Sequence, residues 1–160
     1  MPETRIELLQ GMPIFGAIRE DTLRYLLEQT RSVSRRAQEF FFREGDRASG
    51  IFVLETGRAR VIKEWRGRQL LRKQLGPGDC FGEMALMDLL PRSASVQASD
   101  DCTAIEITPD HLYRLFERDA EQFVLIQMNM GREVSRRLRA TDEQLFRAEM
   151  AAARGPDESR

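Results

Sequence analysis

Glu83 and Arg92 are the two side chains of this 160-residue chain whose types and surroundings best suit a small charged ligand. They stand at the two ends of a short apolar segment. The carboxylate follows a glycine-rich turn at 76–79 (GPGD), and the arginine precedes three small residues at 93–95 (SAS). Because a guanidinium binds phosphate oxygens and an ionised carboxylate accepts hydrogen bonds, the pair suits a ligand that carries both a phosphate and hydroxyls.

The segment between these two residues is expected to contribute through its backbone. Residues 83–90 are rich in helix formers and begin just after Gly82. The first amides of such a helix lack intrahelical partners and favour an anion. A plainer alternative is a turn, a one-turn helix and a surface salt bridge, and the spacing alone leaves both interpretations open.

The whole segment 81–96, FGEMALMDLLPRSASV, resembles the phosphate-binding cassette of cyclic nucleotide-binding domains. That family includes the bacterial catabolite activator, the regulatory subunits of cyclic-nucleotide-dependent kinases, and cyclic-nucleotide-gated channels. The resemblance implies that Glu83 binds the ribose 2′-hydroxyl, that Arg92 binds the cyclic phosphate, and that Ser93 contacts phosphate or base. The other cassette residues that we assign to the nucleotide site are Gly82, Met84, Ala85 and Ala94.

Four parts of the chain follow from its periodicity. Residues 1–30 form an N-terminal helical element, and residues 31–108 alternate short strands with tight turns, which favours a sandwich or jelly-roll-like barrel. Residues 109–153 are helical again, and the tail 154–160 is predicted to be disordered. The predicted fold is therefore mainly β with flanking helices, and the resemblance implies a double-stranded β-helix.

Several side chains have expected roles within these parts. Asp21 is the expected cap of the second helix, since a short acidic side chain at a helix start can accept from unpaired amides. Leu54, Val61 and Leu71 are weaker candidates for walls of the ligand pocket, because they lie on apolar strands.

A long helix is predicted from about Ala120 to Ala153. Its second half repeats apolar or small residues at spacings of four and three, the pattern of a two-helix contact, at Val134, Leu138, Thr141, Leu145, Ala148 and Ala152. A helix of roughly 30 residues spans about 45 Å, which is longer than a small barrel. We therefore expect a homodimer through this helix, and packing of the same residues on their own barrel is the alternative.

The stretch 136–141 (RRLRAT) also resembles the dimer helix of the catabolite activator, in which a Thr followed by a Ser reaches the adenine. Thr141 is thus a candidate base contact, although Asp142 stands at the Ser position. A polar residue tolerated between two helices is the alternative. The arginines around it alternate with acidic residues and are expected to form a solvated helix face.

Composition excludes several classes of function. The net charge of −1 gives no signature of nucleic-acid binding, and no apolar run is long enough to span a membrane. Cys80 and Cys102 have no metal or redox spacing and are expected to be reduced thiols of a cytoplasmic protein. One histidine and no nucleophile–base pair predict neither a metal site nor catalysis.

The sequence therefore predicts a cyclic nucleotide sensor that is not an enzyme and that relays ligand binding through its C-terminal helices to an unknown protein partner. The resemblance at Thr141 favours cAMP over cGMP, whereas Ser93 is compatible with both. Only about ten residues follow Met150, so the chain is expected to lack a DNA-binding domain. The alternatives are the truncated sensor half of a cAMP-responsive transcription regulator, a regulatory module of a channel or kinase, a cyclic nucleotide hydrolase, and an interaction barrel without ligand.

Overall fold

The computed structural model of the chain describes residues 2–83, 87–88 and 90–154. Helices flank a central set of eight strands. The elements in chain order are α1 (Pro2–Gln10), the 3₁₀ turn η1 (Pro13–Phe15), α2 (Glu20–Gln29), β1 (Arg31–Arg35), β2 (Phe40–Phe42), β3 (Ile51–Thr56), β4 (Ala59–Trp65), β5 (Arg68–Leu75), β6 (Cys80–Phe81), β7 (Ser95–Ala98), β8 (Cys102–Ile107), α4 (Pro109–Arg118) and α5 (Ala120–Ala153).

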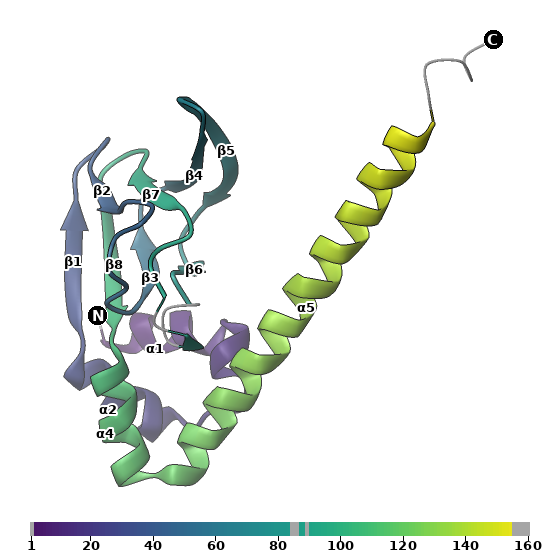
Figure 1. Ribbon diagram of the computed structural model, residues 1–160. Coiled ribbons are helices and arrows are strands. Elements are labelled where there is room, and N and C mark those ends of the chain that lie inside the picture. The colour runs from purple at the N-terminus through teal and green to yellow at the C-terminus, as the bar shows by residue number, and fades with distance from the viewer. Residues whose placement is uncertain (1, 84–86, 89, 155–160) are drawn as a thin grey trace.

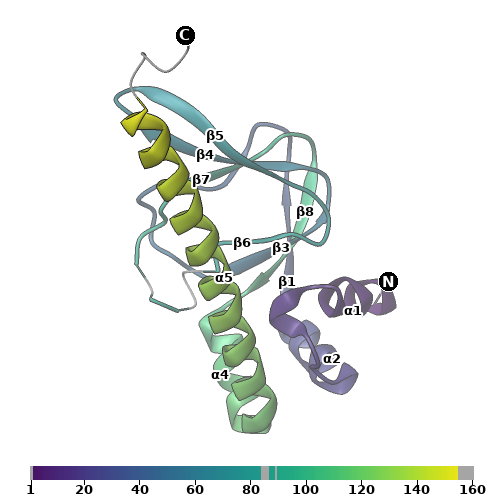
Figure 2. The ribbon, with the colours of Figure 1, turned by 90° about the vertical axis from the view of Figure 1, so that its right-hand side faces the viewer.

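The strands form two four-stranded antiparallel sheets that face each other. One sheet has the order β1-β8-β3-β6 and the other the order β2-β7-β4-β5. The helices α1, α2 and α4 gather at one end of the strands, and α5 leaves that end and runs diagonally past the barrel (Figures 1 and 2). This arrangement confirms the predicted fold class, a mainly β, jelly-roll-like barrel with flanking helices.

Strand β3 separates the two hydrophobic cores of the molecule. Its side chains alternate between the faces of the sheet, as in any strand. Ile51 and Val53 pack in the cluster that includes the helices, whereas Phe52 and Leu54 pack inside the barrel. All four are buried, which explains why this strand is a continuous apolar run in the sequence.

Strands β4 and β5 form a hairpin whose turn and register both matter for the site. The two turn residues, Arg66 and Gly67, have positive φ angles of 49° and 75°, as a tight two-residue hairpin requires. Further along, Val61 pairs with Lys73 but Ile62 pairs with Leu71. Arg72 is therefore an extra residue, a β-bulge that shifts the alternation of β5.

The helix starts differ in how they are capped. Thr108 and His111 form a reciprocal capping box that begins α4, and Asp119 accepts a hydrogen bond from the backbone amide of Gln122 at the start of α5. The predicted cap of α2 was wrong. That helix begins at Glu20 after Arg19, so Asp21 lies inside its first turn.

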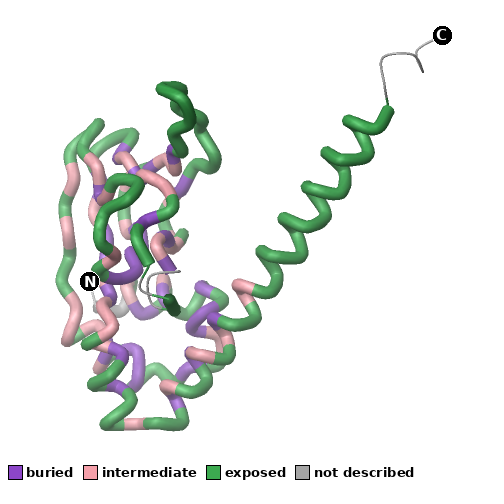
Figure 3. Tube along the Cα trace, viewed as in Figure 1, coloured by how far each residue is buried: buried purple, intermediate pink, exposed green. Residues whose placement is uncertain are grey.

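Helix α5 extends from Ala120 to Ala153, as predicted, but its buried and half-buried residues all lie before Ser135. There Ile126 and Met130 are buried, and the Asn129 side chain donates to the carbonyl oxygens of Ile14 and Gly16 at 3.2 and 2.8 Å. From Ser135 onward the helix is exposed along its length (Figure 3). Nowhere in the described ranges is a helix long and apolar enough to cross a membrane.

All of the predicted two-helix seam except Val134 lies in this exposed part. Leu138 and Leu145 are 60% and 56% exposed. These two leucines therefore do not pack on their own barrel, whereas Val134 at the start of the seam is half-buried.

Candidate functional site

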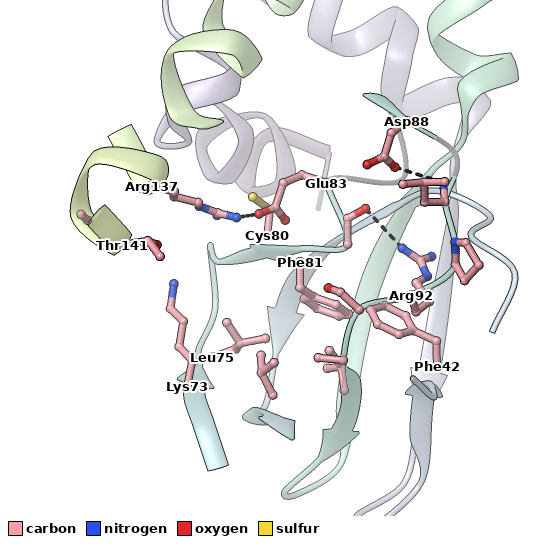
Figure 4. Close-up of a pocket in the computed structure, with 18 of the residues that line it drawn as sticks. Phe42, Lys73, Leu75, Cys80, Phe81, Glu83, Asp88, Arg92, Arg137 and Thr141 are labelled. Atoms are coloured by element: carbon pink, nitrogen blue, oxygen red, sulfur yellow. Dashed lines mark hydrogen bonds and ion pairs between the residues drawn. The ribbon is translucent and has the colours of Figure 1, made fainter. Parts of the chain in front are cut away.

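A cavity of about 500 Å³ opens between the barrel and the middle of α5 (Figure 4). Its walls come from β2, β4, β5, β6, the cassette and α5. The lining residues are Phe42, Val61, Lys73, Leu75, Cys80, Phe81, Gly82, Glu83, Asp88, Leu90, Pro91, Arg92, Ser93, Ala94, Val96, Arg137, Ala140, Thr141 and Gln144. Both halves of the predicted cassette motif thus reach one cavity.

Gly82 sets the geometry at the start of the cassette. Its φ is +79°, a backbone conformation that favours glycine. A Cβ atom on this residue would stand 2.5 Å from Nη1 of Arg92 and 3.2 Å from the carbonyl oxygen of Gly50. The absence of a side chain therefore allows the Arg92 guanidinium to lie against the backbone.

Arg92 is only 6% exposed, and contacts with the barrel hold its side chain in place. Its Nη2 donates to the Gly50 carbonyl oxygen at 2.8 Å and its Nη1 to the Gly82 carbonyl oxygen at 3.2 Å. The guanidinium lies over the ring of Phe42, with its central carbon 3.9 Å from the ring centroid. These contacts fix where the positive charge stands.

The charge of Arg92 is not compensated locally. No carboxylate of the described chain lies within ion-pairing distance of it, and its buried Nε has no hydrogen-bond partner. Burial lowers the pKa of this guanidinium, while the more distant Glu106 and Asp46 act in the opposite direction. A buried charge without a partner is costly, so the site favours an anion.

Glu83 is also buried, at 8% exposure, and its carboxylate forms an ion pair with Arg137 of α5. The sequence placed the arginines around Thr141 on a solvated helix face, and Arg137 is exposed there, but its ion pair with Glu83 was not predicted. The sequence feature that could have placed Arg137 at the site is its spacing from Thr141. Arg137 stands four residues before Thr141 and so lies on the same side of α5.

The opposite wall comes from β4 and β5. Val61, Lys73 and Leu75 line the cavity, as the sequence expected only for Val61. Leu71 does not line it and is 51% exposed, because the bulge at Arg72 shifts the alternation of β5. Leu54 does not line it either, since it is fully buried in the barrel core.

The α5 wall includes Thr141, which faces the cavity together with Ala140 and Gln144. Ser93 and Ala94 line the cassette side. Two further predicted residues, Met84 and Ala85, lie outside the described residues, as does half of the predicted cassette helix 83–90.

The cavity thus offers a buried cation at one end, a carboxylate in the middle, and an apolar slot between the sheet and α5. Figure 4 shows Arg92 on one side and Lys73, Thr141 and Arg137 on the other. Such a site can hold an anionic group, a hydroxyl group and a flat ring in that order. Among the described residues, no group of three His, Cys, Asp or Glu side chains is arranged to bind a metal ion.

Comparison with known proteins identifies the family that the cassette resembles, over a region that includes the cassette. Residues 32–119, more than half of the chain, match the family model of the cyclic nucleotide-binding domain. The chain is 27% identical over 139 residues to the cyclic AMP receptor protein of Thermus thermophilus, covering 86% of this chain and 62% of that protein. It is 29% identical over 107 residues to the cAMP-dependent protein kinase regulatory subunit of Emericella nidulans, covering 67% of this chain and 26% of that protein.

A solved structure supports the fold. A cyclic nucleotide-binding domain from Methylobacillus flagellatus superimposes with a TM-score of 0.79 at 23% identity, covering 92% of this chain and 83% of that one. The chain spans less than two thirds of the length of the two curated relatives above. On the family match, the cassette residues and the fold together, the chain belongs to the cyclic nucleotide-binding domain family.

Proposed function

We propose that this chain is a sensor that binds a 3′,5′-cyclic purine nucleotide in the cavity between barrel and α5. The observation that carries the proposal is Arg92, a buried guanidinium with no carboxylate partner in the described chain. A singly charged cyclic phosphate would supply the missing anion. The neighbouring residues Ser93 and Ala94 leave room for it, and Glu83 would accept a hydrogen bond from the ribose 2′-hydroxyl.

The relay of the signal would run through Glu83 and Arg137. In the structure this carboxylate is already paired with an arginine of α5. A ribose hydroxyl that engages Glu83 changes what holds α5 against the cavity, and a base that contacts Thr141 adds a second link. Ligand binding would then shift the population between two positions of α5, to the extent that the nucleotide binds one of them better.

Two observations favour cAMP as the nucleotide that binds, and one does not distinguish cAMP from cGMP. Thr141 lines the cavity, and the names of the two curated relatives refer to cAMP, which favours cAMP. Ser93 is compatible with cAMP and with cGMP.

We propose no catalytic step, because the two relatives are named as a receptor and as a regulatory subunit. The free cysteines suit a cytoplasmic location.

The exposed seam of α5 supports a homodimer. Leu138 and Leu145 lie on one face of the helix at two-turn spacing and are both more than half exposed. Leu145→Asp would place a charge at the centre of a helix pair and is expected to convert a dimer into a monomer, as measured by sedimentation velocity. Glu143→Asp, on another face of the same turn, is the matched control. An unchanged mass for Leu145→Asp would exclude this seam as the dimer contact.

The test of the sensor proposal is calorimetric titration with cAMP and with cGMP. The protein is first unfolded and refolded to remove any nucleotide that copurifies, and its fold is checked by circular dichroism. We expect micromolar or tighter binding of at least one nucleotide, which is about 8 kcal/mol or more of binding free energy. Folded protein that binds neither nucleotide at millimolar concentration would refute the proposal.

A further inference from the structure

Among the described residues that line the cavity, Lys73 is the one cationic side chain to which the proposed function assigns no role. It projects from β5, opposite Val61 on β4. No carboxylate of the described chain pairs with it. In Figure 4 its ammonium group points toward Thr141, on the side of the cavity away from Arg92.

This position lies at the base end of the proposed ligand. With the phosphate on Arg92 and the ribose on Glu83, the ring must extend away from Arg92, since both contacts fix the other end. The space there lies between the strands that carry Val61 and Leu75 and the helix that carries Thr141. A purine in this slot presents its edge to Lys73.

The polar groups at this end differ in what they can distinguish. The hydroxyl of Thr141 and the amide of Gln144 can each donate and accept, so they suit either purine. Arg137 is engaged by Glu83. Lys73 has three donors and no acceptor, so it is the group that distinguishes an accepting from a donating ring edge.

The two purines differ on this edge. Guanine presents two acceptors, N7 and O6, whereas adenine presents the acceptor N7 beside the donor N6 amino group. An ammonium group can therefore donate to both acceptors of the guanine edge, whereas on adenine it can donate only to N7 and meets the N6 donor beside it. We propose that Lys73 is a specificity-determining residue that makes this site prefer a 6-oxo purine, and thus cGMP over cAMP, a preference opposite to the one Thr141 suggests. The inference rests on the proposed function and extends it to the base.

The test uses three probes that separate the groups of the base. These are cGMP, cAMP and inosine 3′,5′-cyclic monophosphate, which keeps the 6-oxo group but lacks the 2-amino group. Each is titrated by calorimetry into refolded, nucleotide-free wild-type protein, into Lys73→Met and into Arg72→Met. The last variant is the matched control, because it removes a cation from the adjacent position of β5, which does not line the cavity.

We expect wild type to bind cGMP and the inosine nucleotide about tenfold or more tightly than cAMP. Lys73→Met is expected to bring all three within about threefold of one another, by weakening the two 6-oxo nucleotides. Arg72→Met is expected to keep the wild-type order. Should Lys73→Met not fold, as judged by its thermal melt, Lys73→Gln takes its place, since an amide both donates and accepts and should likewise remove the preference.

Three results would overturn the inference. Wild type that binds cAMP as tightly as cGMP has no 6-oxo preference, and an unchanged preference in Lys73→Met assigns it to another residue. Tight binding of cGMP with weak binding of the inosine nucleotide assigns recognition to the 2-amino group. In all three the sensor proposal survives, because a nucleotide still binds. Absence of binding by every probe instead refutes the sensor proposal, and this inference with it.

Discussion

Two arginines face the same cavity from opposite walls, and they are held in different ways. Arg92 belongs to the barrel wall, is 6% exposed, and lies against backbone carbonyl oxygens and the ring of Phe42. Arg137 belongs to the α5 wall, its side chain is 48% exposed, and it forms an ion pair with the carboxylate of Glu83.

The difference indicates a division of labour between the two walls. The two carbonyl oxygens belong to Gly50, which directly precedes β3, and Gly82, which directly follows β6, so the paired strands hold them in place and the charge of Arg92 is preorganised. The exposed part of α5 has few contacts that oppose its movement (Figure 3), and exposed ion pairs contribute little to stability. We therefore expect the barrel wall to set affinity and the α5 wall to carry the response.

The largest expected effect is at Arg92. Arg92→Ala removes the buried partner of the phosphate and should weaken cyclic nucleotide binding by about 2–5 kcal/mol, the cost of truncating one member of a buried charge pair. Calorimetry measures this loss. Arg43→Ala is the control, because Arg43 also lies 3.9 Å over a phenylalanine ring, that of Phe40, but does not line the cavity. Equal affinities of Arg92→Ala and wild type would show that Arg92 does not bind the nucleotide.

Gly82→Ala tests whether the barrel wall is preorganised through its backbone. The new Cβ would clash with the Arg92 guanidinium at 2.5 Å and would also hold a positive φ, which by itself costs about 1–2 kcal/mol. Gly67→Ala is the matched control, since it has a positive φ of +75° but nothing within 4 Å of its Cβ. We expect both variants to lose stability in urea unfolding and only Gly82→Ala to lose nucleotide affinity. Retained affinity in Gly82→Ala would show that Arg92 tolerates displacement.

Arg137→Gln tests the α5 wall. Because the pair with Glu83 is half exposed on its arginine side, we expect its loss to lower the free energy of unfolding by only about 1 kcal/mol. Amide hydrogen exchange in the part of α5 that faces the cavity should become faster without ligand. Arg136→Gln, which breaks a pair within α5 itself to Glu133, is the control and should leave this exchange unchanged. Slower exchange in Arg137→Gln would contradict an anchoring role.

The smallest expected effect is at Gly131, an interior residue of α5 whose Cβ would meet nothing within 4 Å. Gly131→Ala should raise the free energy of unfolding by about 0.5–1 kcal/mol, because alanine favours the helix. Urea unfolding at two protein concentrations measures it. A loss of stability, greater at the higher concentration, would mean that another helix covers this face.

Much of this site could be predicted from the chain. Glu83 and Arg92 were identified from residue type, turn chemistry and cassette pattern, and they line one cavity in the structure. The bounds of α5 followed from its periodicity. Such features are local, since capping, periodicity and turn geometry depend on a few neighbouring residues.

The errors arose where distant parts of the chain meet. Leu71 and Lys73 are separated by one residue, and simple alternation would place both in the cavity. The bulge at Arg72 leaves Lys73 inside and turns Leu71 out. Leu54 is an apolar strand residue like Val61, but the barrel core covers it completely. A sequence pattern indicates which side chains share one face of a strand. It does not indicate which part of that face another element covers.

The sequence by itself determined the family, the fold class and the two charged groups of the cassette, because motifs and periodicity depend on residues that are neighbours in the chain. Only the tertiary structure decided that Arg137 reaches Glu83 and that Lys73 lines the same cavity. These residues come from α5 and β5, which are far apart in the chain. Their meeting depends on how α5 crosses the barrel and on a bulge in β5, and neither follows from local periodicity.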